Sequence, residues 1–382
     1  MPGELPVIAL FWTCVALVAY PYAIYPLALV ALNRLGGRRA HAGDPGHLPT
    51  VSVILPVHNE AVRVTTRIAN LLAQDYPADR MQILVIGDGC TDDTLERASS
   101  VGGDRVTVIP LAARNGKAAA LNAGLAAATG DIVVFTDAGI ILEPRAMRHL
   151  VGHFADPAIG CVSGEDYIEG AETEGLYGRL ELLLRREEAR LHSIAGASGC
   201  FYGQRRELCE PFRPGMAPDF LSVLNTVRRG SRALAEPAAR GSMTATSSQS
   251  AEFTRKVRTF LRGITALLGN ASLLNPFRYP AFSFILVSHK LMRWLAPLPM
   301  AGCLVSAFLL RADPLYLAAF IAQLVLYAAA VAGILFPAFA ARLGVVRLST
   351  FFVLVNAAAL KALWLWITGH RLEVWQPTQR PK

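Results

Sequence analysis

The chain has 382 residues, of which 53% are hydrophobic and only 17% are charged, and its mean hydropathy is +0.37. Disordered chains and nucleic-acid-binding tails need the opposite balance, so this composition excludes both as the main theme. The formal net charge is +8. In a membrane protein such an excess usually marks cytoplasmic loops and contacts with anionic headgroups, and it can also serve an anionic substrate. We therefore expect a membrane protein, or a soluble domain with membrane segments attached.

The first predicted element is a transmembrane helix over residues 5–32, which include no charged residue. This run is long enough to cross the hydrocarbon core and too long for the core of a signal peptide. Arg34, Arg38 and Arg39 follow it directly. The positive-inside rule then predicts that the chain emerges from the membrane in the cytoplasm.

Residues 49–263 have the composition of a globular α/β domain. Apolar strands separated by helices are typical of βαβ units around a buried, mostly parallel sheet, whose ligands bind beyond the carboxyl ends of the strands. The predicted elements are strands at 51–55, 82–86, 105–109 and 131–136, and helices at 60–73, from 91, and at 116–128.

Several of these strand ends carry polar residues. Asp88 follows the second strand, Asp137 follows the fourth, and Lys117 opens the helix between them. Each has an ordinary structural interpretation as a turn, a first-turn lysine or a loop carboxylate. Together they place two carboxylates and a lysine at one edge of the sheet, where a diphosphate, a metal and a base could bind.

This combination of motifs resembles the family 2 glycosyltransferases, the membrane-attached synthases that use nucleotide-diphospho-sugars, over about residues 51–263. The family's proline-x-x-asparagine-glutamate motif runs here from Pro56 to Glu60, and the resemblance implies that both residues contact the donor. Its Asp-Asp-Gly-Ser-Thr-Asp motif corresponds to residues 87–92, which implies that Asp88 contacts a uracil-like base.

The resemblance implies further roles downstream. Lys117 stands in the family's Gly-Lys motif, and Asp137 opens its metal-binding Asp-x-Asp motif, although Gly139 replaces the second carboxylate. We expect Asp137 to hold a divalent metal, magnesium or manganese, because oxygen ligands favour these ions. Asp219 occupies the place of the family's catalytic base, with Pro218 in place of the usual acid.

Arg255 and Arg258 lie in a basic segment that looks like the interfacial helix of polysaccharide synthases. The Gln-x-x-Arg-Trp motif of processive synthases is present only as this pair, so processive or single addition stays open. We expect both arginines to bind the diphosphate, and a basic helix near anionic headgroups is a compatible alternative. One base and no sign of a covalent nucleophile favour single displacement with inversion.

The last third predicts a membrane anchor: amphipathic interfacial helices at 264–294, about three transmembrane helices at 295–369 and a basic tail at 370–382. Lys361 is costly in mid-membrane unless it reaches the interface or faces protein. The side of the C-terminus stays open, because the basic tail favours the cytoplasm and the number of crossings favours the outside. The six scattered cysteines are predicted to be reduced.

The sequence thus predicts an α/β GT-A-like, Rossmann-like domain inserted between transmembrane helices, with its catalytic domain on the cytoplasmic side of the cell (inner) membrane. The expected activity is inverting hexosyl or N-acetylhexosaminyl transfer from a UDP-linked sugar to a polysaccharide or lipid-linked acceptor, with membrane lipids and no nucleic acid as partners. Export or accessory subunits stay open. The alternatives are transfer of a single sugar to a polyprenyl phosphate, and a degenerate membrane scaffold favoured by Gly139 and Pro218.

Overall fold

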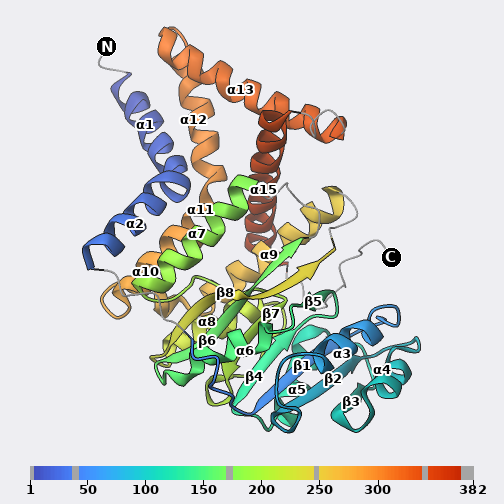
Figure 1. The fold of residues 1–382 in the computed structure, drawn as a ribbon. Helices are drawn as coiled ribbons and strands as arrows, with labels where there is room; N and C mark the ends of the chain where they lie inside the picture. The colour runs from blue at the N-terminus through green and yellow to red at the C-terminus, as the bar shows by residue number, and fades with distance from the viewer. Residues whose placement is uncertain (1–3, 37–42, 169–174, 245–248, 338–342, 371–382) are drawn as a thin grey trace. The chain divides into compact units, whose positions relative to one another are not determined.

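The computed structural model describes residues 4–36, 43–168, 175–244, 249–337 and 343–370 (Figure 1). The chain divides into two compact units. Unit 1 comprises residues 1–28, 247–264 and 284–371, and unit 2 comprises residues 29–246, 265–283 and 372–382. Unit 1 carries eleven Lys and Arg residues against three Asp and Glu residues, so the whole formal excess of +8 belongs to unit 1 and unit 2 is balanced.

Unit 2 is built on one eight-stranded sheet in the order β3-β2-β1-β4-β7-β6-β8-β5. The first four strands pair in parallel, as predicted, while β7 is antiparallel to both β4 and β6 and makes the second half mixed. The strands are β1 (Val51–Val57), β2 (Met81–Asp88), β3 (Val106–Leu111), β4 (Ile132–Thr136), β5 (Ile140–Leu142), β6 (Ile159–Ile168), β7 (Phe201–Arg205) and β8 (Arg232–Met243).

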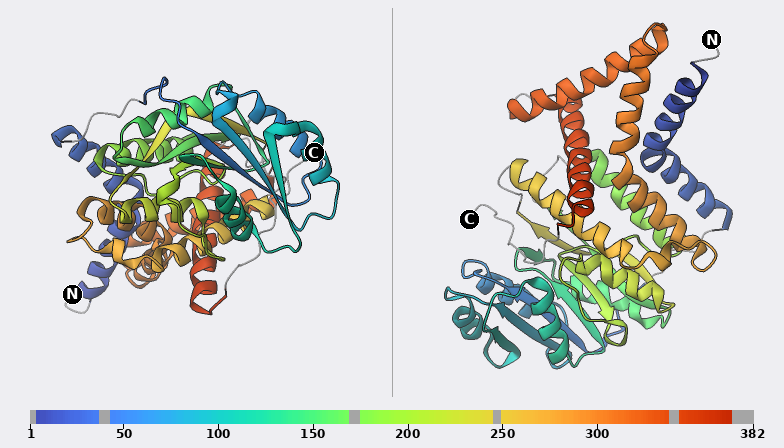
Figure 2. Two further views of the ribbon diagram at one scale, coloured as in Figure 1. Left: turned by 90° about the horizontal axis from the view of Figure 1, so that it is seen from below. Right: turned by 180° about the vertical axis from the view of Figure 1, so that it is seen from behind.

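Helices cover both faces of this sheet (Figure 2). On one face Val53 and Leu55 of β1 pack into the main hydrophobic core with Ile68 of α3. On the other face α5 comes so close that a Cβ atom at Gly124 would lie 2.5 Å from Cγ2 of Ile54. The helices of unit 2 are α3 (Val64–Leu72), α4 (Thr94–Gly102), α5 (Lys117–Ala127), α6 (Ala146–Gly152), α7 (Gly175–Leu191) and α8 (Pro218–Arg228).

The predicted strands and helices of residues 51–136 are all present, and their ends differ by a few residues. The largest difference is at α3, which begins at Val64 and not at residue 60. The carbonyl of Glu60 accepts hydrogen bonds from the amides of both Arg63 and Val64, so a turn precedes the helix. This turn leaves residues 58–60 free to form a loop at the sheet edge.

Unit 1 is helical in its described part, and some of its helices continue into unit 2. Three helical segments of the chain are long and apolar enough to cross a membrane: Leu5–Gly36, Pro314–Leu335 and Gly344–Ile367. A fourth span would form if Pro280–Leu295 and Pro297–Leu309, which meet at 53°, cross as one bent segment. The helices are α1 (Leu5–Ala19), α2 (Tyr25–Gly36), α9 (Gln249–Leu268), α10 (Pro280–Ile285), α11 (Met292–Leu295), α12 (Pro297–Leu309), α13 (Pro314–Leu335) and α15 (Gly344–Ile367).

Some sequence predictions fall outside the described residues, namely those on Arg38, Arg39 and the tail from residue 371 onward. Within unit 1, the ammonium nitrogen of Lys361 lies 5.6 Å from the ring centroid of Phe253, so this lysine faces protein. All six cysteines are free, as predicted.

Candidate active site

Asp88 organises the turn that leads into the site. It ends β2 with 1% of its surface exposed, and its two carboxylate oxygens accept hydrogen bonds from the backbone amides of Asn115 and Gly116 at 2.7 and 2.9 Å. Gly116 has a φ of 87°, a left-handed conformation that favours glycine. Asp88 therefore holds the turn from which Lys117 begins α5, and its contact with a nucleotide base stays a prediction.

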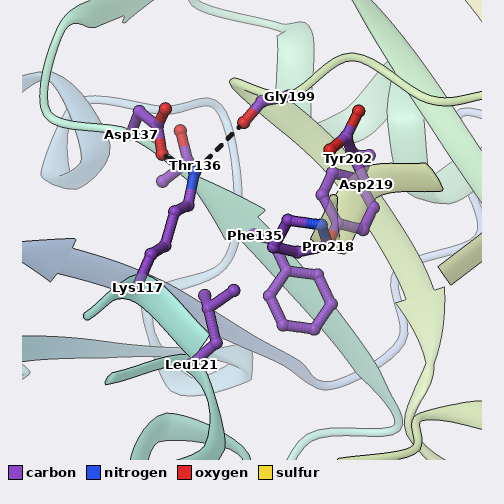
Figure 3. A pocket seen from close by; sticks show the side chains of 9 residues that line it. All are labelled: Lys117, Leu121, Phe135, Thr136, Asp137, Gly199, Tyr202, Pro218 and Asp219. Atoms are coloured by element: carbon purple, nitrogen blue, oxygen red, sulfur yellow. Dashed lines mark hydrogen bonds and ion pairs between the residues drawn. The ribbon is translucent and has the colours of Figure 1, made fainter. Parts of the chain in front are cut away.

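Lys117 and Asp137 meet in a small pocket at the end of β4 (Figure 3). The Nζ of Lys117 lies 2.5 Å from Oδ1 of Asp137 and 3.4 Å from the carbonyl oxygen of Gly199. The two side chains are only 16% and 27% exposed. Burial alone would lower the pKa of Lys117, but the Asp137 carboxylate outweighs it and raises that pKa, so the lysine is charged at neutral pH.

Asp219 enters the same pocket from the side opposite Asp137 (Figure 3). It lies in the first turn of α8, directly after Pro218, which occupies a position where proline suits a helix start. A Cβ atom at Gly199 would lie 3.9 Å from the Asp219 carboxylate, an ordinary contact distance, so Gly199 lies beside Asp219 in the pocket. The pocket is lined by Lys117, Leu121, Phe135, Thr136, Asp137, Gly199, Tyr202, Pro218 and Asp219.

Asn122 holds the loop that precedes Asp219. Its side-chain amide donates to the carbonyl of Phe212 at 3.0 Å, and its side-chain oxygen accepts from the Phe212 amide at 2.7 Å. This paired contact fixes the loop at residues 211–217 on α5. Two neighbouring residues of α5 thus serve the site: Leu121 lines the pocket and Asn122 anchors the loop.

A wider cavity of about 510 Å³ lies at the ends of β1 and β2. The side chain of Asn59 accepts the Thr91 amide at 2.9 Å and joins the two loops. Gly89 has a φ of 60°, and a Cβ atom there would lie 2.5 Å from the Arg114 amide nitrogen, so only glycine fits. The lining residues are His58, Asn59, Gly89, Cys90, Thr91, Leu111, Ala112, Ala113 and Arg114.

Pro56 and Glu60, which were predicted to contact the donor, both contact other residues of unit 2. Pro56 is buried in β1, paired in register with Ile86 of β2. Glu60 is also buried, and its carboxylate lies 3.1 Å from the guanidinium of Arg63. Their contact with a donor stays a prediction.

Arg255 and Arg258 lie on α9 in unit 1. Arg255 makes a two-pronged ion pair with Glu252, at 2.8 and 2.7 Å, and Lys256 joins it at 3.2 Å. Burial opposes ionisation of Glu252, but these bonds and charges outweigh it and lower its pKa to about 2. The predicted binding of a diphosphate by the two arginines stays a prediction.

Sequence reasoning missed Arg67 and Thr136, which lie behind Asp137. The Arg67 guanidinium donates to the Thr136 hydroxyl at 2.7 Å and to the Asp137 carbonyl at 3.2 Å. A signal was available: Arg67 shares the apolar face of its helix with Val64 and Leu71, where an arginine needs a partner.

The described residues include no group of three His, Cys, Asp or Glu side chains that could hold a metal by themselves. Magnesium commonly takes one or two carboxylates and completes its shell with substrate phosphates and water. Asp137, partly exposed in the pocket, fits as the single protein carboxylate of such an ion.

Residues 52–212 match the model of the family described as glycosyl transferase family 2. The probable glycosyltransferase YdaM of Bacillus subtilis (strain 168) is 35% identical over 124 residues, 31% of this chain and 30% of that protein. The poly-beta-1,6-N-acetyl-D-glucosamine synthase of Staphylococcus aureus (strain COL) is 26% identical over 164 residues, 40% of this chain and 39% of that protein. The chain therefore matches about a third of the length of these relatives.

One solved structure is similar over nearly the whole chain. The mannosyltransferase PcManGT from Pyrobaculum calidifontis, in complex with GDP-Man and Mn2+, is 25% identical, with a TM-score of 0.73. The match covers 93% of this chain and 99% of that one. The likeness therefore includes the helical segments that flank the sheet domain.

Proposed function

We propose that the chain is an inverting membrane glycosyltransferase that uses a nucleotide-diphospho-sugar, because residues 52–212 match the family 2 glycosyltransferase model and the fold is similar to that of a solved mannosyltransferase. The observation that carries this proposal is the pocket in which Lys117 and Asp137 lie opposite Asp219. Transfer of a sugar needs stabilisation of a leaving diphosphate and removal of a proton from the acceptor. In the pocket, Lys117 is the cation that can stabilise the diphosphate, and Asp219 is the carboxylate that can accept the proton.

The donor's diphosphate would lie at the Lys117–Asp137 side of the pocket. The Lys117 ammonium is already held there and can donate charge-assisted hydrogen bonds to phosphate oxygens. A magnesium or manganese ion held by Asp137 would supply Lewis-acid stabilisation of the leaving group. The Mn2+ in the similar mannosyltransferase structure supports a divalent metal.

Asp219 would accept the proton of the acceptor hydroxyl as that oxygen attacks the anomeric carbon. Its place across the pocket from Asp137 separates the proton acceptor from the leaving group (Figure 3). Such a geometry supports direct displacement with inversion and needs no covalent intermediate.

The donor and acceptor are proposed from the relatives. The poly-beta-1,6-N-acetyl-D-glucosamine synthases support an N-acetylhexosamine as the transferred sugar and a growing glycan as acceptor. We propose a UDP-linked donor, with a hexose as the other candidate sugar and a lipid-linked sugar as the other candidate acceptor. The mannosyltransferase with GDP-Man supports a GDP-linked donor as a second candidate, because its match covers nearly the whole chain. In this second candidate function the chain would transfer a single sugar, for example to a polyprenyl phosphate.

The membrane arrangement completes the proposal. Helices at 5–32 and within 295–369 would anchor the chain in the cell (inner) membrane, with residues 49–263 in the cytoplasm and the amphipathic segment 264–294 at the interface. The candidate spans support the membrane anchor by length and apolarity, and Arg34 near the end of the first of them supports the cytoplasmic side.

The test is a release assay on the purified full chain in detergent. The protein is incubated with a panel of UDP- and GDP-linked sugars, with Mg2+, Mn2+ or EDTA, and the released nucleotide diphosphate is measured. Release that depends on one donor, and on a metal, supports the proposal. Nucleotide binding without release from any donor would support the degenerate scaffold instead.

A further inference from the structure

Arg67 is a fully buried arginine behind the active-site pocket, with 0% of its surface exposed. It lies on α3 within the apolar face formed by Val64, Ile68 and Leu71. Arginine is almost never fully buried unless its charge and its donors are satisfied, because burial of an isolated charge is costly. Its position therefore calls for a reason beyond packing.

The guanidinium donates to three acceptors on two segments of unit 2, the end of β4 and its own helix α3. Nη2 donates to the Thr136 hydroxyl at 2.7 Å, Nε donates to the backbone carbonyl of Asp137 at 3.2 Å, and Nη1 donates to Asn70 at 2.5 Å. All three acceptors are neutral. Asn70 in turn exchanges two hydrogen bonds with the backbone of Leu142, which extends the network to β5.

The same network reaches the loop before β7. The Thr136 hydroxyl donates to the carbonyl of Cys200 at 3.0 Å, and the Asp137 amide donates to that carbonyl at 3.2 Å. The neighbouring carbonyl of Gly199 lies 3.4 Å from the Lys117 ammonium. The guanidinium thus contacts the Thr136–Asp137 wall of the pocket directly and reaches the Gly199–Cys200 wall through Thr136 and Asp137.

The charge of Arg67 also bears on the site. A guanidinium stays protonated in proteins, so Arg67 is a cation, and the Asp137 carboxylate stabilises it. Two cations, Arg67 and Lys117, therefore accompany Asp137 where the motif has Gly139 in place of a second acid. Two positive charges beside one carboxylate leave a net positive charge at this site. That charge attracts a ligand that carries more than one negative charge.

We propose that Arg67 is a positioning residue for the donor's diphosphate. Its fork-shaped hydrogen bonds keep the Thr136–Asp137 turn and the Gly199–Cys200 loop at the spacing that the diphosphate requires, and its buried charge favours the bound anion. The inference rests on the proposed function, in that the anion is the diphosphate of a nucleotide sugar. Arg67 itself does not line the pocket.

The test compares nucleotides that share a base and differ by one phosphate. Arg67→Lys keeps the charge but loses the planar fork, and Thr136→Val removes the hydroxyl that joins Arg67 to Cys200. Binding of UDP and UMP, and of GDP and GMP, is measured by calorimetry on the full chain, with turnover on the same preparations. The matched control is Arg97→Lys, an exposed arginine on α4 that pairs with Asp93.

We expect Arg67→Lys to weaken diphosphate binding by about tenfold or more, and to leave monophosphate binding within about twofold, because the base loops are untouched. Thr136→Val should change the same ratio in the same direction by about threefold, and the control should match the wild type. Donor kcat/KM should fall with the diphosphate affinity.

An unchanged ratio of diphosphate to monophosphate affinity in folded Arg67→Lys would overturn the proposal. So would equal losses of both affinities together with a lowered melting temperature, which a purely structural role predicts. If Arg67→Lys does not fold, the ratio in Thr136→Val decides. A wild type that binds nucleotides but releases none from any sugar donor refutes the proposed function, while the affinity ratio still tests Arg67.

Discussion

Replacement of Asp219 by asparagine should separate chemistry from binding. Asn keeps the size and polarity of the side chain but cannot accept the acceptor's proton. A general base contributes about 10²–10⁴-fold, which is about 3–5 kcal/mol of barrier. We therefore expect turnover to fall at least 10²-fold, with nucleotide affinity within a few-fold of the wild type.

The structure predicts a much smaller effect of this change on stability. Asp219 is half-buried in the first turn of α8, where a carboxylate gains about 0.3–1 kcal/mol from the helix dipole. The loss of folding free energy is thus several times smaller than the expected rise of the barrier. Asp93→Asn is the matched control, because Asp93 is an exposed carboxylate of the same unit that pairs only with Arg97 among the ion pairs described.

Nucleotide diphosphate release and UDP binding are measured on one preparation of each variant. Turnover of Asp219→Asn within about tenfold of the wild type would place the base elsewhere. Glu165, which is buried and whose pKa burial raises, would then be the next candidate, together with Asp166. Collapse of UDP binding together with turnover would make Asp219 a structural residue of the helix start.

Three further predictions address the metal, the topology and the pH response. Asp137→Ala should reduce turnover to less than about a tenth and leave the circular dichroism spectrum unchanged, and a faster variant would remove Asp137 from the mechanism. A cysteine placed at exposed Ser100 should not react with a membrane-impermeant thiol reagent in intact cells, and labelling there would contradict the cytoplasmic orientation of the domain. The native Cys209 is a poor reporter, because burial raises its pKa to about 12. Glu252→Gln should lower the melting temperature by a constant amount above about pH 4.5, and the difference from the wild type should shrink as the pH falls toward about 2. The reason is that a carboxylate with a lowered pKa stabilises the folded state only while it is ionised. A difference in melting temperature that does not change with pH would contradict the ion pair with Arg255.

The parallel half of the sheet was predictable from the sequence because each of its strands is an apolar run between helical patterns. β1 is buried at all seven positions, and such continuous burial accounts for the β-branched and aliphatic residues that fill residues 51–57 except at Ser52 and Pro56. The ends of the helices were less predictable. The start of α3 depends on two hydrogen bonds to the Glu60 carbonyl, and a backbone contact of this kind leaves no mark in composition.

The antiparallel half was not predictable from the same pattern. β7 lies between β4 and β6 although both precede it in the chain, and this order depends on contacts far apart in the sequence. The short strand β5, of three residues, is below the length at which alternation can be recognised.

Within the site, the motifs named the residues that meet, and the structure supplied their partners. Lys117 and Asp137, which the shared sheet edge placed together, line one pocket. Asp219, which came only from the family resemblance, lines the same pocket, while Asp88 does not. The role of Asp88 in holding the turn before α5 could not be read from the sequence, because its partners are backbone amides. Arg67 was missed because a single arginine on an apolar face has many explanations until its acceptors are seen.

The net charge is divided unevenly between the two units. Long-range electrostatic attraction to lipid headgroups and to the donor should therefore differ. Unit 2 is electrically balanced, so it has little long-range attraction for an anionic nucleotide sugar, and capture would depend on short-range contacts with cations such as Lys117, which lines the pocket. Unit 1 carries the entire positive excess, and its attraction to an anionic bilayer acts over about 10 Å at 0.1 M salt. Ionic strength should therefore affect the contacts of unit 1 with anionic headgroups more than the rate at which unit 2 meets its donor, while the candidate spans would keep the protein in the bilayer at any salt concentration.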